Sequence, residues 1–275
     1  MSNLLIVAGF HRSGTSLVAN LLYTAGLFLG ERLLGANAST PTGHFEDREV
    51  IGIHESILRD HGLTWQVSNP FVPTITDRHW NVMEGLIEKR TLHHALWGFK
   101  DPRVCLFLMC WKYLVPGARV LVIYRHYNDC AYSLARRHAR DLLNQKGPVQ
   151  QHIRFWSEPN HAFKMWMEHN RRLVHFADAY PDDVLVVSHQ ALVEGFPLIK
   201  VLNAKWGLGL QPVSIYEIFR RSLPSRPPPS AVCKTRTLRS KLEEIWNRLE
   251  TQATATSKEH ERFLHAHPRF PREIT

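Results

Sequence analysis

The chain has 275 residues, of which 44% are hydrophobic and 21% are charged. This size and composition suit one soluble domain that can fold without metal or disulfide staples, and they exclude the collagen, coiled-coil and disordered classes. With 34 Lys and Arg against 25 Asp and Glu, the formal net charge is +9, so we expect an anionic partner: nucleic acid, a membrane surface or a phosphorylated small molecule.

Cysteine usage and the lengths of the apolar runs bear on location. The four cysteines form no CxxC pair, which favours a reducing compartment. The apolar runs Leu4–Phe10 and Cys105–Trp111 are too short to span a bilayer, and no basic segment precedes the first. We therefore expect a cytoplasmic protein with neither a membrane span nor a signal peptide.

Short apolar runs alternate with helical patterns along most of the chain. The runs are typical of strands buried on both faces of a parallel sheet, and they cover Asn3–Gly9, Ala95–Phe99, Ala118–Tyr124 and Val184–Ser188. Apolar residues at helical spacing predict helices over Thr15–Ala25, Glu46–His61, Asp77–Leu92, Arg103–Val115, Asn128–Leu143 and Phe163–Tyr180. This alternation predicts a three-layer α/β domain with a parallel sheet, right-handed crossovers and helices on both faces.

Other segments lack so clear a pattern. Gly26–His44 predicts a long loop beside the first helix, and long loops within compact domains are usually functional. Leu223–Lys234 contains three successive prolines and predicts a stiff surface loop. Beyond it, Leu238–Leu249 predicts an amphipathic helix, and residues 251–275 a polar tail. Without internal repeats, residues 1–275 are expected to form a single domain.

The segment Gly9-Phe10-His11-Arg12-Ser13-Gly14-Thr15-Ser16 lies between the first predicted strand and the first predicted helix. In this position, successive backbone N–H groups and the positive end of a helix form an anion site. The spacing of Gly9 and Gly14 matches a nucleotide P-loop, but Thr15 stands where that motif requires lysine, and Arg12 supplies the missing charge. A tight turn with capping residues is the alternative. Arg12 and the strand–helix context favour binding of a phosphate-type anion without the equipment of a kinase.

A second candidate anion site follows the third predicted strand. Arg125 lies at the carboxyl end of this strand, where open α/β sheets bind ligands, and Ser133 lies in the second turn of the next helix. A guanidinium and a hydroxyl at this separation can converge on one phosphate. Two anion sites at one edge of a sheet predict a ligand with two separated anionic groups.

These two motifs resemble those of the sulfotransferase superfamily, whose members use 3′-phosphoadenosine 5′-phosphosulfate (PAPS). The segments Gly43-His44-Phe45-Glu46-Asp47 and Lys100-Asp101-Pro102-Arg103 are similar to those of compact bacterial members, and the resemblance covers residues 4 to 135. It implies that Arg125 and Ser133 bind the 3′-phosphate. It also implies that the P-loop-like segment binds the 5′-phosphosulfate through His11, Arg12, Ser13, Gly14, Thr15 and Ser16.

The resemblance further implies in-line transfer of a sulfuryl group to an acceptor hydroxyl of a sugar, lipid, phenol or small metabolite. Negative charge would develop on the departing nucleotide, and fixed cations can stabilise it without a metal ion. Arg12 and Lys100 are the candidates, and Lys100 ends a predicted strand. The alternative for Lys100 is a surface lysine paired with Asp101.

The acceptor hydroxyl also needs a general base. Glu46 is the first candidate, because it follows the long loop and begins a predicted helix. His54 is the second, and His11 and His44 stay open. Glu46 could instead only complement the dipole of its helix.

Several alternatives stay open at this stage. The 17 histidines include no HExxH motif, so we expect no metal site and no requirement for metal. Arg136, Arg137 and Arg140 could steer an anionic donor, but a solvated helix face is the favoured interpretation. An atypical P-loop kinase that uses ATP and Mg²⁺ is one competing function. A basic, non-enzymatic binder of nucleic acid or another anion is the other, although we expect no nucleic-acid partner.

Overall fold

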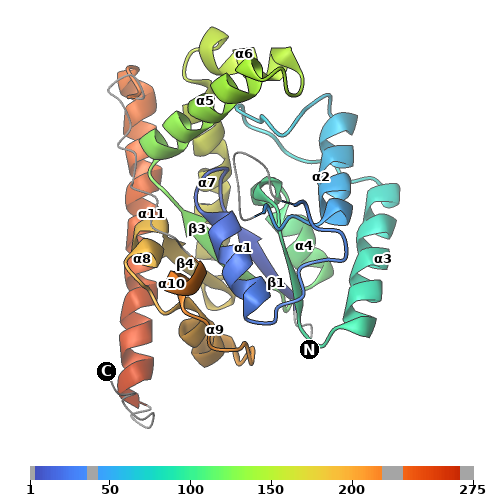
Figure 1. Cartoon of the computed structure of the whole chain (residues 1–275), viewed down its shortest axis with the longest axis vertical. Helices are drawn as coiled ribbons and strands as arrows, with labels where there is room; N and C mark the ends of the chain where they lie inside the picture. The colour runs from blue at the N-terminus through green and yellow to red at the C-terminus, as the bar shows by residue number, and fades with distance from the viewer. Residues whose placement is uncertain (1–3, 36–42, 219–231, 267–275) are drawn as a thin grey trace.

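The computed structural model describes residues 4–35, 43–218 and 232–266 (Figure 1). At its centre is a four-stranded parallel sheet in the order β2-β1-β3-β4. Its strands are β1 (Leu4–Ala8), β2 (Trp97–Lys100), β3 (Arg119–Tyr124) and β4 (Val184–Ser188). The predicted strands and the predicted α/β class are confirmed. The chain passes from β1 to β2 on one side of β1 and then from β2 to β3 on the other side. Open α/β sheets bind ligands where the strand order reverses in this way, so the carboxyl ends of β1 and β3 are the expected ligand site.

The two faces of the sheet contact separate hydrophobic cores. Because side chains alternate along a strand, Leu4 and Ile6 belong to one core, while Leu5 and Val7 belong to the other. The core around Leu5 is covered by α1 (Thr15–Thr24), α8 (His189–Val193), α9 (Leu198–Trp206) and α10 (Ile215–Ile218). The core around Leu4 is covered by α2 (Arg48–Asp60), α3 (Asp77–His93), the 3₁₀ helix η1 (Pro102–Leu106), α4 (Leu108–Leu114), α5 (Tyr127–Leu143), α7 (His161–Ala179) and α11 (Arg236–Ala266). A short 3₁₀ turn, η2 (Pro181–Asp183), leads into β4.

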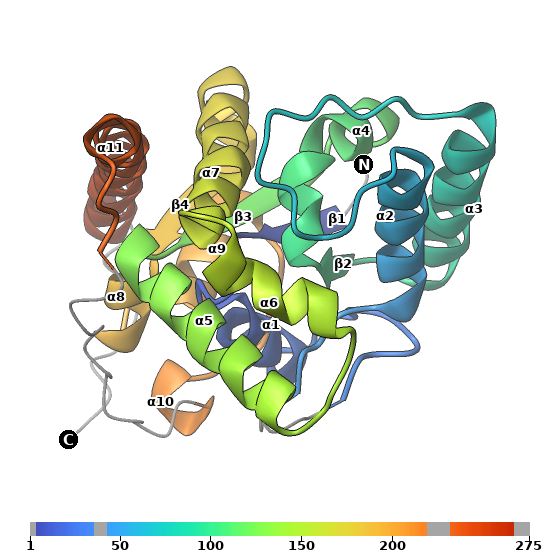
Figure 2. The ribbon, with the colours of Figure 1, turned by 90° about the horizontal axis from the view of Figure 1, so that it is seen from above.

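Helix α5 starts just beyond the carboxyl end of β3 and packs against both α7 and α6 (Val149–Ser157). Figure 2 shows α5 and α6 side by side as a helical hairpin. In this arrangement α5 lies next to the loop that follows β1, as the contact between Arg12 of that loop and Ser133 of α5 shows. This arrangement brings the two predicted anion motifs into one region.

The structure differs from the sequence-based prediction at several boundaries. The helix expected from Glu46 begins at Arg48, since Asp47 caps it by accepting from the N–H of Glu49 at 3.0 Å. The helix expected over Arg103–Val115 is split into η1 and α4, because Phe107 has a non-helical φ of −127°. The short helices α6, α8, α9 and α10 were not predicted.

The remaining differences concern the loop and the C-terminal third. The described part of Gly26–His44 is irregular, as predicted, apart from isolated bridges such as that between Phe28 and Trp97. Residues 219–231, with most of the predicted proline loop, lie outside the described residues. Helix α11 continues through residue 266, so the first part of the segment expected to be a polar tail is helical. Within the described ranges, every helix is too short or too polar to cross a membrane.

Candidate functional site

The loop between β1 and α1 has a backbone that only glycine permits at two positions. A Cβ at Gly9 would lie 2.3 Å from the carbonyl oxygen of Ile123. Gly14 has a φ of +98°, and its Cβ would lie 2.6 Å from the ring of His189. Gly14 is also the N-cap of α1, which carries no side-chain cap and no acidic residue in its first turn. The first N–H groups of α1 therefore keep their capacity to bind an anion.

The loop and helix α5 are joined by side chains of both predicted motifs. The Nε of Arg12 donates to the Oγ of Ser133 at 2.9 Å, and Arg12 holds a left-handed φ of 70°. Beside this contact, the Oγ of Ser13 lies 3.8 Å from the Sγ of Cys130. The backbone carbonyl of Arg125 accepts from the indole of Trp166 at 3.0 Å, which fixes the start of the second motif. The structure thus brings Arg12 and Ser133, which are 121 residues apart, into direct contact.

Several arginines surround this contact. Burial, followed by the charge of Arg137 and smaller effects of Arg125 and Arg136, lowers the pKa of Arg12 to about 10. Arg137 was expected on a solvated helix face, yet only 29% of its side chain is exposed and its charge acts on the loop. Arg125 has one local counter-charge, because its Nε lies 3.3 Å from a carboxylate oxygen of Asp129. Mutual repulsion of this kind marks a place where an anion would be stabilised.

Lys100 connects the loop to Glu46. At the end of β2, its buried ammonium donates to the Oε1 of Glu46 at 2.6 Å and to the Oγ of Ser16 at 3.2 Å. The other oxygen of Glu46 lies 3.8 Å from Arg103. The alternative of a surface lysine paired with Asp101 is therefore wrong. The structure brings together the predicted residues Glu46, Lys100 and Ser16.

His54 lies in a separate buried network. The indole N–H of Trp111 donates to the Nε2 of His54 at 2.9 Å. Because an indole nitrogen only donates, Nε2 is the acceptor, and the ring proton on Nδ1 goes to Asp101, 2.7 Å away. Both ring nitrogens are thus occupied in a side chain with no solvent exposure. The predicted role of His54 as a base does not fit this geometry, since neither nitrogen is free to take a proton from an acceptor.

The His54 network also holds Arg103 through Asp101. Burial alone would raise the pKa of the Asp101 carboxyl, but the Arg103 guanidinium and the hydrogen bond from His54 outweigh it and lower that pKa well below its usual range. The ionised Asp101 then holds Arg103 through an ion pair of 2.7 Å. Because Arg103 also faces Glu46, the network sets the charge around the Lys100–Glu46 pair.

His11 and His44 occupy different parts of the site. Burial, helped by His169 and Arg103, lowers the pKa of His11 well below its usual value, so its ring is neutral. The ring of His11 lies 4.6 Å from that of Trp65. Its Nε2 is buried and has no hydrogen-bond partner among the described residues. Burial also lowers the pKa of His44, against an opposing effect of Glu46.

His189 is a further residue of the site that the sequence analysis missed. It follows β4 directly and begins α8, which places its ring against Gly14. Burial, followed by the charge of Arg125, lowers its pKa to about 4. The rule that parallel strands end at one edge of the sheet could have found it, because His189 follows the fourth apolar run as Arg125 follows the third.

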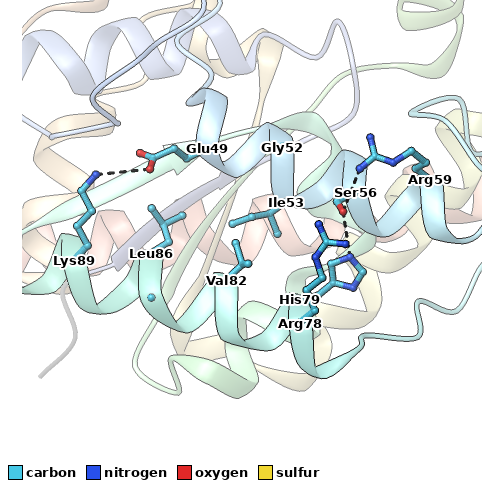
Figure 3. Close-up of a pocket in the computed structure, with 11 residues that line it drawn as sticks. Glu49, Gly52, Ile53, Ser56, Arg59, Arg78, His79, Val82, Leu86 and Lys89 are labelled. Atoms are coloured by element: carbon cyan, nitrogen blue, oxygen red, sulfur yellow. Dashed lines mark hydrogen bonds and ion pairs between the residues drawn. The ribbon is translucent and has the colours of Figure 1, made fainter.

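A surface groove of about 470 Å³ lies between α2 and α3 (Figure 3). It is open because Gly52 and Gly85 leave space where side chains would project. Lys89 and Glu49 pair across it at 3.7 Å. None of the predicted site residues lines this groove. The predicted residues instead contact one another around the loop that follows β1, as the Arg12–Ser133 and Lys100–Ser16 contacts show.

Comparison with known proteins gives matches of structure only. No family model and no curated protein matches the sequence. A sulfotransferase from Alicyclobacillus acidocaldarius is 14% identical, with 93% of this chain and 95% of that chain covered and a TM-score of 0.47. A sulfotransferase domain from the curacin biosynthetic pathway is 13% identical (94% and 98% covered, TM-score 0.44). A sulfotransferase from Mycobacterium tuberculosis H37Rv is 13% identical (90% and 76% covered, TM-score 0.40).

Proposed function

We propose that the protein is a sulfotransferase that moves a sulfuryl group from PAPS to an acceptor hydroxyl. The contact of Arg12 with Ser133, within a group of four arginines, carries this proposal. A glycine-containing loop, the start of a helix and several partly buried guanidinium groups form a strongly anion-attracting site. Burial is the main cause of the lowered pKa of Arg12, and a ligand with separated phosphate groups would relieve the repulsion from neighbouring arginines that adds to it.

The residues present fit such a donor. The loop from His11 to Ser16 and the start of α1 would hold the 5′-phosphosulfate, while Arg125 and Ser133 would hold the 3′-phosphate. Because Arg12 of the first group contacts Ser133 of the second, the two groups of predicted ligands adjoin each other. Thr15 replaces the lysine of a kinase P-loop, so the cations Arg12 and Lys100 would stabilise the charge for which kinases use lysine and Mg²⁺.

Glu46 is the residue that we propose as general base. Its carboxylate accepts a hydrogen bond from Lys100, and Lys100 also donates to Ser16 at the end of the P-loop-like segment. In the substrate complex, Lys100 would turn part of its charge to the donor and leave an oxygen of Glu46 to accept the proton of the acceptor hydroxyl. His11, neutral and with an unpartnered Nε2, is the competing candidate.

Substitution of each candidate tests the base. We expect Glu46→Gln to leave binding of 3′-phosphoadenosine 5′-phosphate within about twofold and to lower turnover by about 10²–10⁴-fold, the usual contribution of a positioned base. His11→Gln is the matched comparison in the same site. If His11→Gln loses turnover and Glu46→Gln keeps it, the base assignment is wrong while the proposed activity stands.

Ligand-induced stabilisation distinguishes the three candidate functions. At a hundredfold excess over its dissociation constant, 3′-phosphoadenosine 5′-phosphate without metal should add about 2.7 kcal/mol to the free energy of unfolding. Preferential stabilisation by ATP with Mg²⁺ would indicate a kinase. Binding of a short oligonucleotide with a steep salt dependence, and no preference for a 3′-phosphate, would indicate a nucleic-acid binder. Transfer of labelled sulfuryl from PAPS to a panel of hydroxyl acceptors then tests the reaction directly.

A further inference from the structure

Two histidines and an aspartate converge in the α5–α6 hairpin. The Nδ1 atoms of His138 (α5) and His152 (α6) are 2.7 Å apart. Asp141 lies one helical turn beyond His138, and one possible ligand atom from each of the three residues lies within 4.8 Å of the others. The histidines are only 4% and 6% exposed. Among the described residues, this is the group of His, Cys, Asp and Glu side chains that is close enough to hold a metal ion.

The hydrogen bonds of His152 define its protonation. Its Nε2 lies 2.5 Å from the carbonyl oxygen of Lys146, which can only accept, so the ring proton is on Nε2. The Nδ1 of His152 therefore presents a lone pair towards His138. A backbone carbonyl that fixes the second ring nitrogen in this way is the usual support of a histidine metal ligand.

No position of the ring proton of His138 satisfies both of its ring nitrogens among the described residues. Its Nε2 is buried and has no hydrogen-bond partner among the described residues. A proton on Nδ1 would bond to His152 and leave the Nε2 lone pair buried and unpaired. A proton on Nε2 would instead leave two Nδ1 lone pairs facing each other at 2.7 Å. A cation between the two Nδ1 atoms removes the lone-pair repulsion of the second arrangement, in which the Nε2 proton of His138 stays without a partner among the described residues.

We propose that His138, Asp141 and His152 bind one Zn²⁺ ion through the two Nδ1 atoms and a carboxylate oxygen, with water as the fourth ligand. Two imidazoles and a carboxylate suit zinc. Zn–N bonds of about 2.0–2.1 Å in tetrahedral geometry separate the two nitrogens by about 3.3 Å, so the present contact needs to open by only about 0.6 Å. Asp141 is 22% exposed, which leaves a side open to water.

The ion would stabilise the helix that carries part of the anion site. It would join α6 to α5 one turn beyond Arg137, whose Nε lies 3.5 Å from Asp141. The ring of Trp65 stacks on His138 with a centroid distance of 5.6 Å and also lies 4.6 Å from the ring of His11. Zinc at this position would link α5 to α6 next to the candidate site. Its binding does not depend on the proposed sulfotransferase activity.

Zinc binding by the full chain tests the proposal. Protein treated with a chelator and dialysed should bind one Zn²⁺ per chain in a titration followed by elemental analysis, and its melting temperature should rise. Co²⁺ in place of zinc should give the visible absorption bands of a tetrahedral site. We expect Asp141→Asn and His152→Gln to weaken zinc binding by more than about tenfold. A loss of about tenfold is the smallest effect usual for residues that only hydrogen-bond to a metal ligand, and loss of a ligand itself should cost more.

The control is His79→Gln, at a histidine of α3 that is also buried (3% exposed) but lies outside the cluster. It should keep the zinc affinity and the cobalt spectrum of the wild-type protein. If His152→Gln does not fold, the conservative variant Asp141→Asn at the more exposed position decides. Failure of the wild-type protein to bind zinc, or equal zinc affinity of wild type and Asp141→Asn, would overturn the proposal.

Discussion

Replacement of Arg12 by alanine should weaken binding of 3′-phosphoadenosine 5′-phosphate without destabilising the ligand-free protein. Its pKa is lowered from 12.5 to about 10. Because a shift of one pKa unit corresponds to about 1.4 kcal/mol, burial and neighbouring arginines disfavour the charged side chain by about 3 kcal/mol. The hydrogen bond to Ser133 offsets about 1.5–3 kcal/mol of this cost. The free energy of unfolding of Arg12→Ala should therefore equal that of the wild type or exceed it by up to about 1.5 kcal/mol.

Ligand binding should change in the opposite direction. Loss of a guanidinium bonded to phosphate in a partly buried site costs about 3 kcal/mol, which raises the dissociation constant by about two orders of magnitude. Urea unfolding without ligand and calorimetric titration with 3′-phosphoadenosine 5′-phosphate measure the two effects separately. Arg59→Ala, at an exposed arginine of α2 that contacts Ser56, is the control and should change neither.

The reverse pattern would contradict a role of Arg12 in anion binding. If Arg12→Ala lowers the stability of the ligand-free protein by more than about 1 kcal/mol and leaves the dissociation constant unchanged, Arg12 is a structural residue whose hydrogen bond to Ser133 exceeds the repulsion. The group of arginines would then not be an anion site, and the proposed function would lose its main support.

Four further predictions follow from the same geometry. Gly14→Ala should lower the free energy of unfolding by at least about 1–2 kcal/mol, measured by urea unfolding, because its φ is +98° and its Cβ would meet His189 at 2.6 Å. Arg125→Ala should weaken calorimetric binding of 3′-phosphoadenosine 5′-phosphate by about 2–3 kcal/mol, whereas unchanged affinity would remove this residue from the site. His54→Gln should lower stability by about 2–4 kcal/mol and leave that affinity unchanged, since both bonds of its ring are structural. Burial lowers the pKa of both His169 and His189 from 6.5 to about 4. As the pH falls, these histidines are therefore protonated at a higher pH in the unfolded chain than in the folded protein. The stability present above pH 6.5 should be lost as the pH falls towards 4, by at most about 3 kcal/mol for each ring. Equal urea midpoints at pH 7.5 and pH 5 would contradict this.

The parts of the structure that the sequence predicts are those set by local pattern. Four short apolar runs became four buried strands, because a strand covered on both faces must be apolar at every position. The loop from Gly9 to Ser16 was recognisable because its glycines, its charge and its place between strand and helix are all local features. Helix α6 was missed because it has only nine residues, fewer than the stretch over which helical spacing of apolar residues can be recognised with certainty. The His138–Asp141–His152 cluster, which depends on α6, was missed with it.

Contacts between distant segments decided the roles of the individual side chains. In sequence, His54 and Glu46 were both plausible bases, and Arg137 was a surface charge. Tertiary structure placed Trp111 and Asp101 on the two ring nitrogens of His54, while Lys100 came between Glu46 and Ser16. A buried polar atom must find a partner, and that partner comes from another element whose position no local pattern specifies. Local pattern specifies which strands and which loop form, whereas the packing of helices on the sheet decides which titratable groups are available for chemistry.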